Sequence, residues 1–256
     1  MNRERAQSLR DLYRNDLMNN VMPFWMHHGI DHEHGGICTG LDRDGTVIDS
    51  DKGMWQQCRF MWMMGELHNT LGSEQPWLEA AINTHEFIER HGYDPVDGRM
   101  WFHVTRDGQP IRKRRYAVTE SFAAIAYGEL AKATGKDQLA AQAEALFDRF
   151  LNHKMGVPGA ELKFTSTRPM RSLGGPMLTI ATAQELRSSI GLEKADALID
   201  GAIEAIQRYH VKPEIRAVME QVGRDGELVD HFDGRTLNPG HAIEAAWFIL
   251  WEGRHR

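Results

Sequence analysis

The sequence predicts an all-α protein whose helices pair as the inner and outer layers of an α/α barrel. Helical segments follow one another in a regular rhythm, and apolar segments alternate with charged, amphipathic ones. The apolar or small-residue segments, expected as inner helices, are 52–71, 116–134, 175–189 and 239–252. The amphipathic segments, expected as outer helices, are 75–91, 137–152 and 193–209. With a first helix at 3–26, about eight helices are expected in one domain over residues 1–256. A stacked solenoid is the alternative, although no fixed-period repeat supports it.

Composition argues against several classes of protein. The 256 residues carry a formal net charge of −6, which argues against a nucleic-acid partner. No apolar run reaches membrane-spanning length, and the first ten residues are charged rather than signal-like, so no membrane partner is expected. Cys38 and Cys58 are too few for a disulfide scaffold or a thiolate metal site. These features together suit a cytoplasmic protein.

Short alternating segments between the helices predict β-hairpins, which we expect at the end of the barrel where the inner helices begin. They turn at Asp–Gly pairs or similar polar residues, a common hairpin signal. The predicted hairpins are 37–48, 94–112 and 216–232, and the segment 156–171 is a looser connection.

The last predicted helix begins with a polar turn and continues as an apolar segment. Asn238 is a favourable N-cap, and Pro239 suits the first helical position. A helix that is apolar nearly all round is expected to be buried. His241 and Glu244 nevertheless lie three residues apart in its first turns and therefore share a face.

Because a helix N-terminus carries a partial positive charge and free N–H groups, it favours an oxyanion on a bound ligand. An imidazole beside it can accept a proton, which makes His241 a candidate base. A capping turn in which His241 only satisfies a loop carbonyl is the alternative.

Several motifs together resemble the N-acylglucosamine 2-epimerase family over nearly the whole chain. The matching residues are Phe24–Trp25, Gly35–Gly36, Leu41–Asp42, Lys52, Trp55, Gln57, Arg59, Tyr116, Glu120, Pro176–Met177 and the segment 235–250. The resemblance implies an (α/α)6 barrel and a sugar substrate, inverted at C2 of its open-chain form by proton removal and return. N-acyl-D-glucosamine is the expected substrate; cellobiose 2-epimerisation or aldose–ketose isomerisation of a mannose-type sugar is the alternative.

The resemblance also implies roles for individual residues. By this resemblance, His241 is expected to be one of two acid/base histidines, with Glu244 supporting it. Arg59 is expected to hold the substrate oxygen. Candidates for substrate binding are Trp55, Tyr116, Glu120, Met177 and Thr179. Cellobiose epimerases and the isomerases carry an extra histidine where this chain has Thr179, which favours the N-acylglucosamine type. For Tyr116 and Glu120, capping and packing are the alternative.

The family's second catalytic histidine lies beyond the eighth helix, so the sequence is expected to lack the C-terminal third of the barrel. This would expose Trp247, Phe248 and Trp251 and favour self-association, with a homo-oligomer as the expected state. The chain would then exchange the C2 hydrogen more readily than it inverts C2. A sugar-binding fragment with impaired catalysis is the non-enzyme alternative.

Two rival sites remain open. A loop carries His27, His28, His32 and His34 with Asp31 and Glu33. A histidine cluster in a loop can bind zinc, but the spacing fits no standard site. A glycoside hydrolase on the same barrel would need two carboxylates across a cleft, for which Glu120 and Glu244 are the candidates. The expected chemistry requires no metal or other cofactor, and a nucleotide effector stays open.

Overall fold

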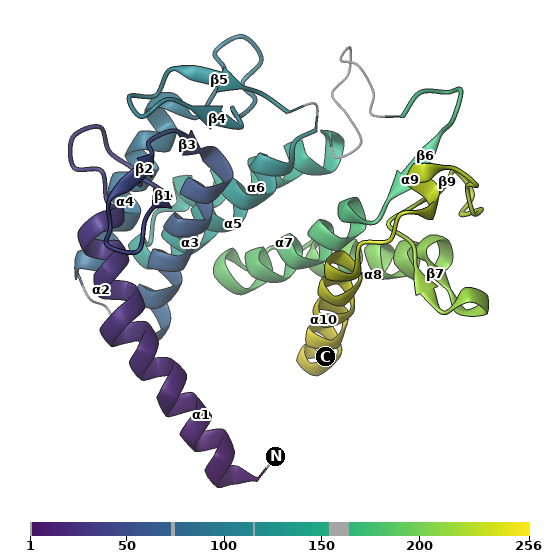
Figure 1. The fold of residues 1–256 in the computed structure, drawn as a ribbon, viewed down its shortest axis with the longest axis horizontal. Helices are drawn as coiled ribbons and strands as arrows, with labels where there is room; N and C mark the ends of the chain where they lie inside the picture. Colours follow the sequence, from purple (N-terminus) through teal and green to yellow (C-terminus); the bar gives the residue numbers. More distant parts are fainter. Residues whose placement is uncertain (1, 73–74, 115, 154–163) are drawn as a thin grey trace. The chain divides into compact units, whose positions relative to one another are not determined.

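The computed structural model describes residues 2–72, 75–114, 116–153 and 164–256 (Figure 1). The chain divides into two compact units, residues 1–113 and 114–256, and each is described by itself. Among the described residues, eight helices have eleven residues or more, which agrees with the number that the sequence predicts. The single domain expected over residues 1–256 stays a prediction.

The helices occupy most of the predicted segments. Their bounds are α1 Arg3–Asp16, α2 Met22–Phe24, α3 Met54–Thr70, α4 Gln75–His91, α5 Val118–Thr134, α6 Asp137–His153, α7 Gly174–Ile190, α8 Ala195–Ala205, α9 Phe232–Arg235 and α10 Pro239–His255. The short strands are β1 Gly40–Leu41, β2 Val47–Asp49, β3 Lys52–Gly53, β4 His103–Val104, β5 Pro110–Arg112, β6 Met170–Ser172, β7 Val211–Lys212, β8 Ala217–Val218 and β9 Gln221–Gly223. Part of the predicted loose connection at 156–171 lies outside the described residues.

Two predicted helices are less regular than expected. The segment 3–26 is regular only as far as Asp16 and then passes through π-helical turns on either side of α2. Pro23 lies in this region and has no N–H to donate to the helical ladder, which is a common cause of such irregularity. The predicted helix at 193–209 likewise ends in a π-helical turn, Ile206–His210.

In the first unit, α3 packs against α4, and the sheet β3-β4-β5 covers the start of α3. Helix α3 buries Met54, Met61 and Met64 completely. The predicted hairpin at 94–112 is confirmed by the antiparallel pair β4 and β5. Its first strand also pairs with β3. The helix predicted from residue 52 therefore begins only at Met54, because the two residues before it belong to the sheet.

The predicted hairpin turns are tight around glycine. Gly45 and Gly108 both have positive φ, 89° and 94°. A Cβ at Gly45 would lie 2.2 Å from the His28 ring, and one at Gly108 would lie 2.1 Å from the His91 ring. Glycine is therefore required at both turns for its conformation and for the close approach of the imidazole.

A buried ion cluster fixes the histidine-rich loop of the first unit. The Lys52 ammonium donates to Asp31 Oδ2 at 2.9 Å and to the carbonyl of Gly35 at 2.7 Å. Arg106 donates to both oxygens of the same carboxylate at 2.9 Å. The Lys52 and Asp31 side chains are fully buried. Burial alone would raise the pKa of Asp31, but the hydrogen bonds from Arg106 and Lys52 outweigh it and hold that pKa well below its usual range.

In the second unit, α5, α7 and α10 form the inner series that the sequence predicts. Helix α5 packs on α6 and α7, and α7 packs on α8 and α10 (Figure 1). The face that α5 buries is rich in alanine, including Ala123, Ala124 and Ala126, which lets neighbouring helices approach closely. The alternation of apolar and amphipathic segments therefore correctly separates inner from outer helices in this unit.

The hairpin predicted at 216–232 is wrong in its pairing. The turn at Asp225–Gly226 is present, with Gly226 at a φ of 93°. However, β9 pairs with β6 from before α7, antiparallel and in the register Ser172 to Gln221. The strand β8 pairs with β7 instead. Local turn signals identify the bend but not a strand partner about fifty residues away.

The expectation that the last helix is buried all round is also wrong. In α10 only Ala245 and Glu252 are buried. Ile243, Trp247, Leu250 and Trp251 are each more than half exposed. Of the apolar flank residues expected to be exposed, Trp247 and Trp251 are indeed exposed, and Phe248 is half-buried.

We expect Asp31→Asn to destabilise the protein by about 3–5 kcal/mol, because it leaves the buried Lys52 ammonium without a counter-charge. Urea denaturation followed by circular dichroism measures the loss. Asp51→Asn, at an exposed aspartate of the same segment, is the matched control and should change stability little. Equal stability of the two variants would contradict a structural role for the cluster.

Candidate functional site

The candidate site begins at the N-terminus of α10. Asn238 is the N-cap, as predicted, and its side-chain oxygen accepts a hydrogen bond from the backbone N–H of His241 at 3.3 Å. Pro239 takes the first helical position. His241 therefore lies in the first turn, where backbone N–H groups and the helix dipole favour negative charge on a ligand.

The side chain of His241 is fixed by a carboxylate. Its Nδ1 lies 2.9 Å from Glu220 Oε2, and the two side chains are 38% and 13% exposed. A carboxylate oxygen accepts hydrogen bonds, so Nδ1 carries the proton and donates a hydrogen bond to Glu220. The lone pair is then on Nε2, the other ring nitrogen. Glu220 thus selects the tautomer in which Nε2 can accept a proton from a ligand.

Glu220 is itself held on both sides by backbone hydrogen bonds. Its carbonyl accepts from the N–H of Leu173 at 2.9 Å, which continues the pairing of β9 with β6. The preceding residue, Met219, donates its N–H to the His210 carbonyl at 2.9 Å and accepts from His210 Nδ1 at 2.8 Å. The position of the carboxylate is therefore set by the sheet and not by α10.

Sequence reasoning missed Glu220 and selected Glu244 instead. The structure places Glu220 against His241, whereas Glu244 is exposed on the next turn of α10. The spacing of His241 and Glu244 puts both on one face of the helix but does not bring a carboxylate to Nδ1. Glu220 precedes a short strand and has no local sequence signal, since it reaches His241 only through the pairing of β9 with β6.

The other predicted site residues of the second unit lie at or near the starts of the inner helices. Tyr116 is half-buried just before α5, and Glu120 is fully buried in its first turn. Met177 and Thr179 are buried in the first turns of α7. The Thr179 hydroxyl donates to the Gly175 carbonyl of its own helix at 2.9 Å. Their roles in substrate binding stay predictions.

Arg59 and Trp55 belong to the first unit, on α3. Arg59 is exposed, and Trp55 is half-buried with its ring 5.6 Å from that of Phe102. The proposed contact of Arg59 with a substrate oxygen stays a prediction.

Two residues of the same sequence motif are structural. Lys52 is the ammonium of the buried cluster around Asp31. The Gln57 amide is also fully buried; its oxygen accepts from the Ile37 N–H and its nitrogen donates to the Ile37 carbonyl, both at 2.8 Å. Both side chains fix the loop that precedes β1, so part of the motif specifies the fold.

A second polar network holds the far end of α10. Glu252 is 2% exposed, and Arg187 of α7 donates to its two oxygens at 2.9 and 2.8 Å. Gln184 donates to Glu252 and to the Phe248 carbonyl, both at 3.0 Å. The hydrogen bond from Arg187 is the largest cause that lowers the pKa of Glu252 to about 2, and it outweighs the opposing effect of burial.

The histidine-rich loop forms no convergent metal site. His28 lies between Phe24 and Gly45, and the His27 and His28 rings meet edge to face at 4.5 Å. Within the part of the chain that the structure describes, no three His, Cys, Asp or Glu side chains are arranged to hold a metal ion. Cys38 and Cys58 are buried and unbridged. None of the described helices has the length and apolarity to cross a membrane.

Sequence comparison places the chain in a family. Residues 35–256 match the family described as N-acylglucosamine 2-epimerase (GlcNAc 2-epimerase). The chain belongs to the N-acylglucosamine 2-epimerase family. The resemblance noted from the motifs is thereby confirmed.

Individual members of the family agree with this assignment. The N-acylglucosamine 2-epimerase of Mus musculus is 30% identical over 244 residues, which cover 91% of this chain and 57% of the mouse protein. The cellobiose 2-epimerase of Eubacterium cellulosolvens is 27% identical over 262 residues, 92% of this chain and 64% of that protein. The chain thus spans less than two thirds of the length of either relative.

A solved structure shows the fold. The cellobiose 2-epimerase of Bacillus thermoamylovorans superposes with a TM-score of 0.79 at 18% identity, covering 95% of this chain and 66% of that one. The predicted fold class, the (α/α)6-barrel type represented by part of its helices and short hairpins, is confirmed.

We expect Glu220→Gln to release the tautomer of His241, because an amide can donate as well as accept. In the unchanged protein, ¹⁵N NMR of the imidazole should show Nδ1 protonated at neutral pH; in the variant a substantial fraction should carry the proton on Nε2. Glu214→Gln, at an exposed glutamate of the same connection, is the control. A neutral imidazole with its proton on Nε2 and none on Nδ1 in the unchanged protein would rule out the assigned hydrogen bond.

We expect the attachment of α10 to weaken in acid. The pKa of Glu252 in the folded protein is about 2, against an ordinary value of 4.5, so its stabilising effect is complete above pH 4.5 and is lost as the pH falls toward 2. Hydrogen exchange of α10 amides at pH 3 and pH 6 measures this. Glu252→Gln should remove most of the difference, whereas exposed Glu204→Gln should retain it.

Proposed function

We propose that the protein is a sugar 2-epimerase and that His241 removes or returns the proton at C2 of an open-chain sugar. The observation that carries the proposal is the hydrogen bond between His241 Nδ1 and Glu220, which leaves Nε2 as the proton acceptor at a helix N-terminus. Membership of the N-acylglucosamine 2-epimerase family supports the reaction class.

The chemistry requires little more than a base and a positive environment. A hydrogen beside a carbonyl is weakly acidic, and its removal leaves an enediolate. His241 would take the proton on Nε2, and Glu220 would stabilise the imidazolium that results. The first-turn N–H groups of α10 and the cationic Arg59 are the proposed stabilisers of the oxyanion; removing one such donor costs roughly 3–4 kcal/mol in well-studied enzymes. No metal is needed for these steps.

The substrate that we propose is an N-acyl-D-glucosamine, converted to the corresponding mannosamine. The family relatives named for N-acylglucosamine are 30% identical or more, while those named for cellobiose are 24–27% identical. Thr179 stands where the cellobiose enzymes and isomerases are expected to carry an additional histidine, which supports the same choice. A homo-oligomer and a cytoplasmic location are part of the proposal.

The test is hydrogen exchange at C2. The protein is incubated in D₂O with N-acetylglucosamine, cellobiose, glucose or mannose, and NMR follows loss of the C2 proton and appearance of the epimer. An epimerase exchanges this proton, whereas a hydrolase cleaves cellobiose without exchange and a binding protein does neither. The absence of exchange with all four sugars would contradict the proposal.

We expect His241→Asn to reduce the exchange rate by about 10²-fold or more, because an amide cannot accept the proton and general acid–base help of this kind is worth roughly 10²–10⁴-fold. His255→Asn, at an exposed histidine in the last turn of the same helix, controls for general effects on α10 and should exchange normally. Normal exchange by the His241→Asn variant would show that another group is the base.

A further inference from the structure

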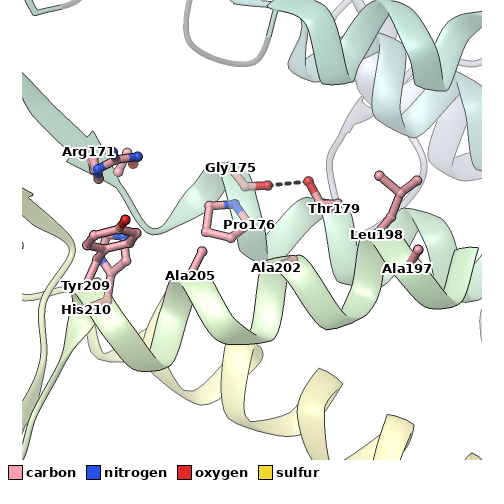
Figure 2. Close-up of a pocket in the computed structure, with 12 residues that line it drawn as sticks. Arg171, Gly175, Pro176, Thr179, Ala197, Leu198, Ala202, Ala205, Tyr209 and His210 are labelled. Carbon is pink, nitrogen blue, oxygen red and sulfur yellow. Dashed lines mark hydrogen bonds between the residues drawn. The ribbon is translucent and has the colours of Figure 1, made fainter. Parts of the chain in front are cut away.

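A cavity of about 340 Å³ lies in the second unit between the first turns of α7 and the length of α8 (Figure 2). This volume is at the lower end of the range for small-molecule sites. Neither His241 nor Glu220 lines the cavity. Thr179, a candidate for substrate binding, does line it, so the cavity lacks the proposed proton-transfer pair but shares one residue with the proposed sugar site.

The long walls of the cavity are apolar and built from small residues. Pro176 from α7 faces Ala202 and Ala205 from α8, and Leu198 lies toward the far end (Figure 2). The space remains open because these side chains are short. A Cβ added at Gly201, also in the wall, would meet no heavy atom within 4 Å. Such walls suit an apolar chain or ring.

The other end of the cavity is polar and cationic. Arg171 of β6 gathers there with Tyr209 and His210 from the π-helical turn that follows α8 (Figure 2). The Arg171 guanidinium carbon lies 4.4 Å from the centre of the Tyr209 ring. Arg171 Nε donates to the Arg224 carbonyl, and among the described residues no carboxylate pairs with this guanidinium.

His210 adds a buried polar group at the same end. It is 2% exposed, and its Nδ1 donates to the Met219 carbonyl, which leaves Nε2 as an acceptor. Burial is the main cause that lowers the pKa of His210, and the positive charges of Lys212 and Arg171 lower it further. Arg171 therefore supplies the permanent positive charge at this end of the cavity, next to the buried imidazole.

We propose that this cavity binds a small amphipathic carboxylate, with its anionic head against Arg171 and its apolar part between α7 and α8. The guanidinium matches a carboxylate in charge and in fork geometry, and partial burial strengthens such charge-assisted hydrogen bonds. The apolar walls match the remainder of the ligand. A purely polar anion would leave those walls unfilled, and a neutral molecule would leave the charge of Arg171 unmatched.

The experiment is a titration of the protein with octanoate, octanamide or inorganic phosphate, followed by calorimetry and by NMR of the Tyr209 and His210 rings. Two variants distinguish binding of the carboxylate head from binding of the apolar part of the ligand. Arg171→Met removes the charge and keeps the length of the side chain; Arg208→Met is its control, since Arg208 also approaches Tyr209, at 5.1 Å, but does not line the cavity. Gly201→Leu adds a side chain at the cavity wall and favours the helix. Gly253→Leu on α10, where an added Cβ also meets nothing, is its control.

Octanoate should bind at one saturable site. Arg171→Met should weaken the affinity for octanoate about tenfold or more, as expected for loss of one charge-assisted hydrogen bond. The affinity for octanamide should not change in this variant. Gly201→Leu should weaken both ligands, and both control variants should bind octanoate normally. Absence of saturable octanoate binding, equal affinity for octanamide or phosphate, or unchanged binding by folded Gly201→Leu would each overturn the proposal.

Discussion

The ion pair between Arg187 and Glu252 is the constraint on which the position of the candidate base depends. Helix α10 buries only one apolar side chain, Ala245, so hydrophobic packing alone cannot fix its angle or depth against α7. The bidentate pair supplies what packing lacks, because its two parallel hydrogen bonds define a direction as well as a distance. With the far end of the helix fixed on α7, its N-terminus carries His241 to the carboxylate of Glu220.

In the first unit, a buried carboxylate paired with cationic side chains likewise fixes a loop. Asp31 receives hydrogen bonds from Lys52 and Arg106, and Gln57 binds both backbone groups of Ile37. A loop has few apolar side chains to bury, so its shape must come from polar groups withdrawn from water and fully paired. Both units thus combine helix pairs held by apolar packing with a further element held by buried polar side chains, which is a loop in the first unit and α10 in the second.

The sequence predicts well what depends on local periodicity. The alternation of apolar and amphipathic segments separates α5 and α7 from α6 and α8, and Asn238 followed by Pro239 locates the start of α10. Positive φ at Gly108 and Gly226 agrees with the turns predicted there. These features need only a few neighbouring residues, so the pattern contains the information.

What the sequence could not predict depends on residues that are distant along the chain. The pair of His241 and Glu220 spans 21 positions, and that of Arg187 and Glu252 spans 65. The apolar composition of α10 predicts a buried helix. Burial, however, depends on which neighbouring elements cover the helix, and its own sequence does not identify them. Glu244 was the natural choice of carboxylate from helical spacing, while the carboxylate that reaches Nδ1 comes from a different element.

The pairing of β6 with β9 has a consequence for the chemistry of the base. Side chains alternate between the two faces of a strand, so a slip of one residue would replace Glu220 by Met219 or Gln221 at the place that faces His241. A thioether would leave Nδ1 without a strong acceptor, and an amide would no longer distinguish the two ring nitrogens. The register of two three-residue strands therefore decides which nitrogen of the imidazole can take a proton. Neither strand belongs to the helix that carries the histidine.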